Sequence, residues 1–138
     1  MNFLLDVNLL MALLWENHEQ HALTRRWLSA TTTFVTCPVA QLGFARVSSH
    51  PSLGYGMSPD QAFKVLRAFL SDPRHQFLSD DLSCQDRVVR TDLMLGANQV
   101  TDHYLVAPAR QHRLSLATLD QPLVRAFASE SGLVHLVQ

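Results

Sequence analysis

Hydrophobic and polar positions divide the chain into short apolar runs and longer stretches that have helical spacing. The short runs are rich in Leu, Val, Phe and Thr, a composition typical of strands. They predict strands at residues 2–5, 31–37, 76–78, 114–117 and 133–137.

The longer stretches carry apolar residues three or four positions apart, which is the pattern of a helix with one buried face. The first contains Leu9, Leu10, Leu13 and Leu14, and further helices are expected at residues 22–28, 39–48, 58–72, 85–95, 100–112 and 122–129. Ser58, Pro59 and Gln61 have the types and spacing of an N-cap, a first-turn proline and a capping box. Pro108 is expected to distort its helix or to mark a late turn.

Alternating strands and helices predict an α/β fold, in which helices cover both faces of a mainly parallel sheet. Ligands of such folds bind beyond the carboxyl ends of the strands. The chain has 138 residues, 47% of them hydrophobic, which is enough for one sizeable core. We therefore expect a single domain over residues 1–138, with the Pro- and Gly-rich residues 50–56 as a loop that borders a site.

The 11 basic and 12 acidic residues nearly cancel, so any contact with RNA must be local. Every basic residue except Lys64 is an arginine, whose planar guanidinium suits phosphate, although a GC-rich genome would give the same bias. The longest apolar run is shorter than a membrane span, and the N-terminus has no basic leader. These features predict a soluble, cytoplasmic protein without a membrane partner.

Two cysteines, Cys37 and Cys84, lie far apart and have no further Cys or His at zinc-finger spacing. This argues against a disulfide scaffold or a zinc module and predicts two buried thiols. The chain also lacks a Gly-rich phosphate loop that ends in Lys-Ser or Lys-Thr.

Three acidic residues fall at predicted element junctions, where their side chains can converge. Asp6 follows the first strand, Asp102 begins a helix, and Asp120 follows the strand at 114–117. Clustered carboxylates repel each other unless a cation lies between them, and oxygen ligands favour Mg²⁺ or Mn²⁺. Taken singly, Asp102 and Asp120 fit ordinary helix-terminal or turn residues better than functional ones, whereas Asp6, followed by Asn8, is the stronger functional candidate.

The same acids carry a resemblance to a known family. Residues 4–10, LLDVNLL, resemble the opening of PIN domains, and residues 100–105 and 116–120 resemble the two later acidic motifs of that family, in the same order. Residues 37–47, CPVAQLGFARV, with the following 49–51, resemble the VapC branch, whose members are toxins of type II toxin–antitoxin pairs.

This resemblance covers nearly the whole chain. It implies a three-layer α/β/α sandwich with a Mg²⁺ or Mn²⁺ site at Asp6, Asp102 and Asp120 and endoribonuclease activity. It also implies a homodimer and inhibition by a small cognate antitoxin.

Gln41 departs from the family pattern, because most PIN domains have a glutamate near the start of this helix. An amide oxygen can coordinate a hard cation or hold a water molecule, but it adds no charge and cannot act as a general base. Lower metal affinity is therefore expected. Asp80 and Asp81 could supply the missing charge, although we favour the reading that they only start a helix.

Three further residues are candidates for supporting roles around the acids. Thr118 could orient Asp120 or a metal-bound water, and Asn8 could do the same for Asp6. Arg46 could hold the scissile phosphate, or equally be a structural ion pair or a helix-surface residue.

The leading hypothesis is therefore a metal-dependent endoribonuclease that uses Asp6, Asp102 and Asp120 with help from Gln41. The alternative is a binding module that has weakened catalysis and still holds RNA or a protein partner. A phosphatase or receiver-like fold is disfavoured, because Asn8 stands where a second Asp is needed and the single lysine, Lys64, lies in a predicted helix.

Overall fold

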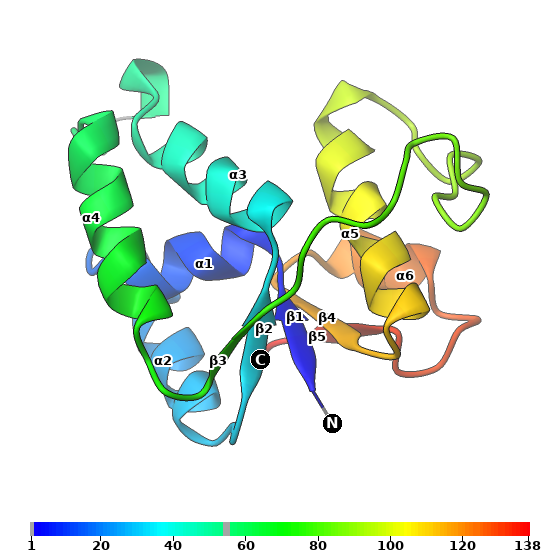
Figure 1. Ribbon diagram of the computed structural model, residues 1–138, viewed down its shortest axis with the longest axis horizontal. Helices are drawn as coiled ribbons and strands as arrows, with labels where there is room; N and C mark the ends of the chain where they lie inside the picture. Colours follow the sequence, from blue (N-terminus) through cyan, green and yellow to red (C-terminus); the bar gives the residue numbers. More distant parts are fainter. Residues whose placement is uncertain (1, 54–55) are drawn as a thin grey trace.

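The computed structural model describes residues 2–53 and 56–138, and a parallel sheet forms its centre (Figure 1). Within these residues, the sheet has five strands in the order β3-β2-β1-β4-β5. The strands are β1 (Phe3–Leu5), β2 (Phe34–Thr36), β3 (His75–Phe77), β4 (Ser115–Thr118) and β5 (Val134–Leu136). All strand pairs are parallel, as the alternating sequence pattern predicts.

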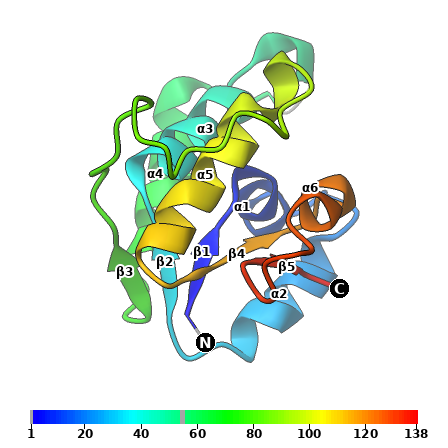
Figure 2. The same cartoon turned by 90° about the vertical axis from the view of Figure 1, so that its right-hand side faces the viewer.

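Helices cover both faces of this sheet, which makes the fold a three-layer α/β/α sandwich. They are α1 (Val7–Leu14), α2 (His21–Ser29), α3 (Pro38–Ser48), α4 (Pro59–Leu70), α5 (Val100–Gln111) and α6 (Gln121–Ala126), with short 3-10 turns η1 (Pro51–Leu53) and η2 (Ala97–Gln99). Figure 1 shows α1, α2 and α4 on one side of the strands, and α5 and α6 on the other. Figure 2 faces this second side and shows α5 in front of the sheet.

The strand order places a topological switch point between β1 and β4. The chain builds outward from β1 to β2 and β3, and then returns to add β4 and β5 on the opposite side of β1. Side chains of the central strands and their helices are fully buried, including Leu4, Leu5, Phe34, Phe44 and Leu116. Because the chain continues from β1 to β2 on one side and from β4 to β5 on the other, the loops that leave β1 and β4 at their carboxyl ends diverge and leave a crevice between them. Ligands of open parallel sheets bind in such a crevice.

Most predicted elements form; the strands predicted at 2–5, 31–37 and 133–137 are shorter than expected, and those predicted at 76–78 and 114–117 are shifted by one residue. The capping box at the start of α4 is present, because Ser58 and Gln61 bond each other's backbone N–H groups. Helix α5 continues through Pro108 and ends at Gln111, so this proline marks its last turn. Of the predicted loop at 50–56, Gly54 and Tyr55 lie outside the described residues.

The predicted helix at 85–95 is wrong, because this segment forms successive turns. Val88, Val89 and Thr91 are β-branched and disfavour a helix. The backbone is instead fixed from outside, where the Arg110 guanidinium donates to the Val88 carbonyl at 3.0 Å. Asp86 accepts from the backbone N–H of Ser83 at 2.8 Å, which closes a local turn.

Two smaller expectations fail in the same loop. Asp80 and Asp81 do not start a helix; the Asp81 carboxylate lies 3.0 Å from Nε2 of His112 at the end of α5. Cys84 lies in the loop and is exposed, whereas Cys37 is buried as predicted. In the described part of the chain, no helix has the length and apolar character needed to cross a membrane.

Candidate active site at the carboxyl edge of the sheet

Asp6 lies at the junction of β1 and α1, where it is completely buried. One carboxylate oxygen accepts from the backbone N–H of Val7 at 2.7 Å and caps the helix. The other oxygen accepts from the Thr118 hydroxyl at 2.7 Å, across the switch point between β1 and β4. The side chain is therefore fixed by its own helix and by the neighbouring strand.

Thr118, the last residue of β4, connects three of the predicted site residues. Its hydroxyl donates to Asp6 and accepts from the side-chain amide of Asn8 at 3.1 Å and from the backbone N–H of Asp120 at 3.1 Å. Asn8 in turn accepts from the backbone N–H of Leu119 at 3.2 Å. Asn8 thus supports Asp6 through Thr118, and this network holds the ends of β1 and β4 together.

Asp102 and Asp120 reach the same edge from different elements. Asp102 lies in the first turn of α5, and Asp120 caps α6 by accepting from the backbone N–H of Leu123 at 3.3 Å. Both are half-buried. A cavity of about 300 Å³ opens beside Asp102 and is also lined by Asn8, Arg46 and Asn98.

The electrostatics of these acids show that they lie close together. Burial and the neighbouring charge of Asp102 raise the pKa of Asp6 from 3.8 to about 7, with a smaller contribution from Asp120. Burial and the charge of Asp120 raise the pKa of Asp102 from 3.8 to about 6. Among the residues described, none of the three carboxylates forms an ion pair with a basic side chain, so their repulsion is uncompensated.

The donor chemistry of this edge suits a hard divalent cation. In residues 2–53 and 56–138, no three His, Cys, Asp or Glu side chains are gathered into a ready-made metal cage. Mg²⁺ usually needs only one or two protein carboxylates and completes its shell with water and substrate phosphate. Carboxylates without a cationic partner fit that mode of binding.

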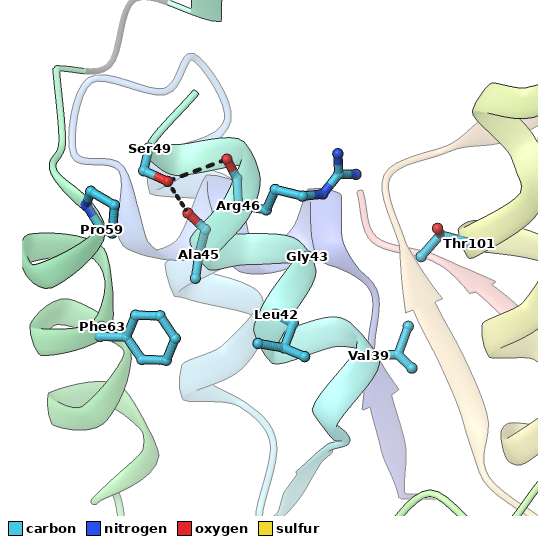
Figure 3. Close-up of a pocket in the computed structure, with 9 residues that line it drawn as sticks. All are labelled: Val39, Leu42, Gly43, Ala45, Arg46, Ser49, Pro59, Phe63 and Thr101. Atoms are coloured by element: carbon cyan, nitrogen blue, oxygen red, sulfur yellow. Dashed lines mark hydrogen bonds between the residues drawn. The ribbon is translucent and has the colours of Figure 1, made fainter. Parts of the chain in front are cut away.

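Arg46 extends from the last turn of α3, and Figure 3 shows its guanidinium pointing toward the side of α5. It lines the cavity beside Asp102 and also a larger groove of about 560 Å³ between α3 and α4, where Leu42 and Phe63 contribute apolar side chains. No ion pair of Arg46 exists among the described residues. A structural ion pair is therefore not observed, and Arg46 is exposed on the surface of α3, so its role toward phosphate stays a prediction.

Gly43 sets how closely α3 approaches the first turn of α1. A Cβ atom at this position would lie 2.6 Å from Cγ2 of Val7, which is too close for any side chain. The absence of a side chain lets α3 pack directly behind the residue that follows Asp6. This close contact explains the glycine in the block that precedes Arg46.

Gln41 lies one turn into α3, and its side chain turns to β2. Its amide nitrogen donates to the Thr36 hydroxyl at 2.9 Å, and this hydroxyl lies 2.7 Å from Nε2 of His75. The described residues contain no hydrogen bond from Gln41 to Asp6, Asp102 or Asp120. Thr36 and His75 are absent from the residues singled out by sequence, because pairing across strands gives no local signal.

Comparison with known proteins agrees with this architecture. The model of the PIN domain family matches residues 3–127. Ribonuclease VapC38 of Mycobacterium tuberculosis is 42% identical over 120 residues, which cover 85% of this chain and 84% of that protein. Ribonuclease VapC29 of the same species is 38% identical over 137 residues, which cover 99% of this chain and 91% of the relative.

Solved structures share the fold at low sequence identity. Mycobacterium tuberculosis VapC20, a toxin that cleaves the sarcin-ricin loop, has a TM-score of 0.66 at 15% identity and covers 90% of this chain and 94% of its own. VapBC2 from Rickettsia felis, solved bound to a DNA fragment from its promoter, has a TM-score of 0.66 at 16% identity and covers both chains completely. Sequence and fold together place this protein in the PIN-domain family, in its VapC branch.

Proposed function

We propose that the protein is a Mg²⁺- or Mn²⁺-dependent endoribonuclease and the toxin of a type II toxin–antitoxin pair. The observation that carries this proposal is the set of buried and half-buried carboxylates at the switch point, where burial and neighbouring acids raise the pKa of Asp6 and Asp102 and none of the described residues supplies a basic partner. Repulsion between carboxylates does not stabilise the fold, so a bound cation is the expected compensation for their charge. Relatives that are named ribonucleases support RNA as the substrate.

Asp6, Asp102 and Asp120 would hold the divalent cation. When bound, the ion would polarise a phosphodiester and lower the pKa of a water molecule for attack on phosphorus. The chain's own residues set the geometry: Thr118 and the Val7 backbone fix both oxygens of Asp6.

Arg46 is the residue we assign to the substrate. It is exposed, lines the same cavity as Asp102, and carries a guanidinium that can bind a phosphate through two parallel hydrogen bonds. Gln41 would contribute an amide oxygen where related proteins have a carboxylate, which lowers the negative charge of the site.

A small cognate antitoxin is the proposed protein partner. The relatives carry VapC names, and the VapBC2 structure from Rickettsia felis supports such a pairing. We further propose that the protein is a homodimer, which light scattering of the purified chain tests directly.

A second candidate function is that of a binding module with weak or no catalysis. Two observations favour it: Gln41 replaces the expected carboxylate, and the described residues contain no preassembled three-ligand metal cage. Such a protein would still bind RNA or its partner through the cavity beside Arg46.

The two functions are separated by incubating the purified protein with a pool of small RNAs in Mg²⁺, in Mn²⁺ and in chelator. We expect metal-dependent cleavage that is abolished in Asp6→Asn, since the variant keeps the shape of the side chain and removes its charge. Circular dichroism verifies that the variant is folded. Cleavage by the variant at the wild-type rate would contradict the nuclease site, and a folded wild type that cuts under no condition would favour the binding module.

A further inference from the structure

A chain of hydrogen bonds at the edge of the acidic cluster has no role in the proposed reaction so far. It runs from the Gln41 side-chain amide to the Thr36 hydroxyl at 2.9 Å and on to Nε2 of His75 at 2.7 Å. Thr36 is completely buried and ends β2, and His75 begins β3, the neighbouring strand. A buried polar chain of this kind is costly unless every donor and acceptor is used.

The direction of each hydrogen bond follows from counting hydrogens. Burial lowers the pKa of His75 and so favours a neutral ring, and a hydrogen bond with the backbone of Leu70 acts in the opposite direction, as a ring N–H donating to a carbonyl does. A neutral imidazole has one N–H, so Nε2, on the side of Thr36, must accept. The Thr36 hydroxyl then gives its single hydrogen to His75 and can only accept from Gln41.

The identity of the Gln41 atom facing Thr36 is thereby fixed. Only the NH₂ group can donate, so it turns toward Thr36 and the amide oxygen is left free of this chain. Thr36 ends the strand next to β1, and Asp6 follows β1 directly, so both lie at the carboxyl edge of the sheet. Burial, with smaller contributions from the charges of Asp80 and then Asp6, raises the pKa of Cys37, the residue between Thr36 and the start of α3.

We propose that Thr36 and His75 are positioning residues, which hold the Gln41 amide so that its oxygen, and not its nitrogen, faces the acidic edge. The hydrogen-bond chain supports this orientation of the Gln41 amide. The effect of that orientation on metal binding and cleavage rests on the proposed nuclease function. An amide oxygen at this position can coordinate a cation or accept a hydrogen bond from a bound water, whereas the NH₂ group can do neither.

The same chain of hydrogen bonds explains why an amide side chain suits position 41. A glutamate at position 41 has no hydrogen to give, so Thr36 would have to donate to it and His75 would be left without its donor. We therefore expect Gln41→Glu to weaken the chain even though it restores the carboxylate of related proteins.

The first test examines the hydrogen bonds themselves by nuclear magnetic resonance and does not depend on RNA cleavage. We expect the Gln41 side-chain amide protons to be shifted and protected from exchange, and Nε2 of His75 to be the unprotonated ring nitrogen. Thr36→Val should remove the protection, and Thr36→Ser, which keeps the hydroxyl, should restore it. Unprotected amide protons in the wild type, or a protonated Nε2 at neutral pH, would overturn the proposal.

The second test is a double-mutant cycle on Mn²⁺ affinity and on RNA cleavage. We expect Thr36→Val to weaken Mn²⁺ binding and kcat/KM about tenfold, Thr36→Ser to recover them within about twofold, and Thr36→Val to add nothing in a Gln41→Ala background. Additive losses would mean that Thr36 acts only on stability and would overturn its positioning role. A wild type that neither binds Mn²⁺ nor cuts RNA would refute the nuclease function, while the resonance test would still decide the hydrogen-bond chain.

Discussion

Acidic side chains have opposite electrostatic surroundings at the amino and carboxyl edges of the sheet. At the amino edge, Arg74 lowers the pKa of Asp72 from 3.8 to about 2, and Arg110 lowers the pKa of Glu130. At the carboxyl edge, burial and neighbouring carboxylates raise the pKa of Asp6 and Asp102. Both of these amino-edge acids are therefore paired with an arginine, whereas the two carboxyl-edge acids are surrounded by other acids.

The pairs at the amino edge serve the fold. Arg74 bonds both oxygens of Asp72 and also donates to the carbonyls of Leu28 and Thr31, which precede β2. Arg110 bonds both oxygens of Glu130 and so ties the end of α5 to the segment before β5. These contacts stabilise the connections between layers.

The carboxyl edge offers no comparable benefit to the fold. Asp6 loses its hydration completely and gains only two hydrogen bonds for its charge. Acids that remain in such a place at the cost of stability are typical of functional sites. The comparison predicts that substitutions at one edge change activity, and that substitutions at the other edge change stability.

The largest effect is expected from a matched pair of substitutions, one at each edge. Asp102→Asn should reduce RNA cleavage by at least about a thousandfold, because a cation at this edge supplies several kcal/mol of transition-state stabilisation. Its free energy of unfolding should not fall. Glu130→Gln, the control, should keep cleavage within about twofold and lose about 1 kcal/mol of stability. Rate measurements and urea denaturation of both variants test this, and the comparison fails if both lose activity alike.

A second prediction concerns the pH dependence of stability without metal. The raised pKa of Asp6 means that the folded protein holds this proton more tightly than the unfolded chain. The free energy of unfolding should therefore fall as pH rises from about 4 to about 7, on the order of 2 to 3 kcal/mol. Asp6→Asn should flatten this slope. Urea denaturation in chelator at pH 5 and pH 8 measures it, and equal slopes in both proteins would contradict the prediction.

The sequence was sufficient to predict the fold class and the position of the acids. Asp6, Asp102 and Asp120 lie where strands end or helices begin, and these junctions are visible as changes in periodicity. In a parallel sheet such junctions share one edge, so their meeting follows from the topology. Their roles in catalysis and metal binding stay predictions.

Features that depend on contacts between distant segments could not be predicted in this way. The loop at 85–95 looked helical from its own residues, but its conformation is fixed by Arg110, from α5. The partners of Gln41 are Thr36 on β2 and His75 on β3, which meet only after the strands pair. A local pattern carries no information on such contacts.

The smallest expected effect is at the amino edge, where Asp72 is accessible to solvent. Its lowered pKa means that the folded protein keeps the carboxylate ionised at a pH where the unfolded chain takes up a proton. The contribution of the Asp72–Arg74 pair is therefore complete above about pH 4 and is lost as pH falls toward 2. Asp72→Asn should be slightly less stable than wild type at pH 7 and should approach it in acid, as thermal unfolding at both pH values can measure. A constant difference between the two proteins at all pH values would mean that this pair acts through packing and not through charge, which would remove the amino edge as the electrostatic opposite of the site.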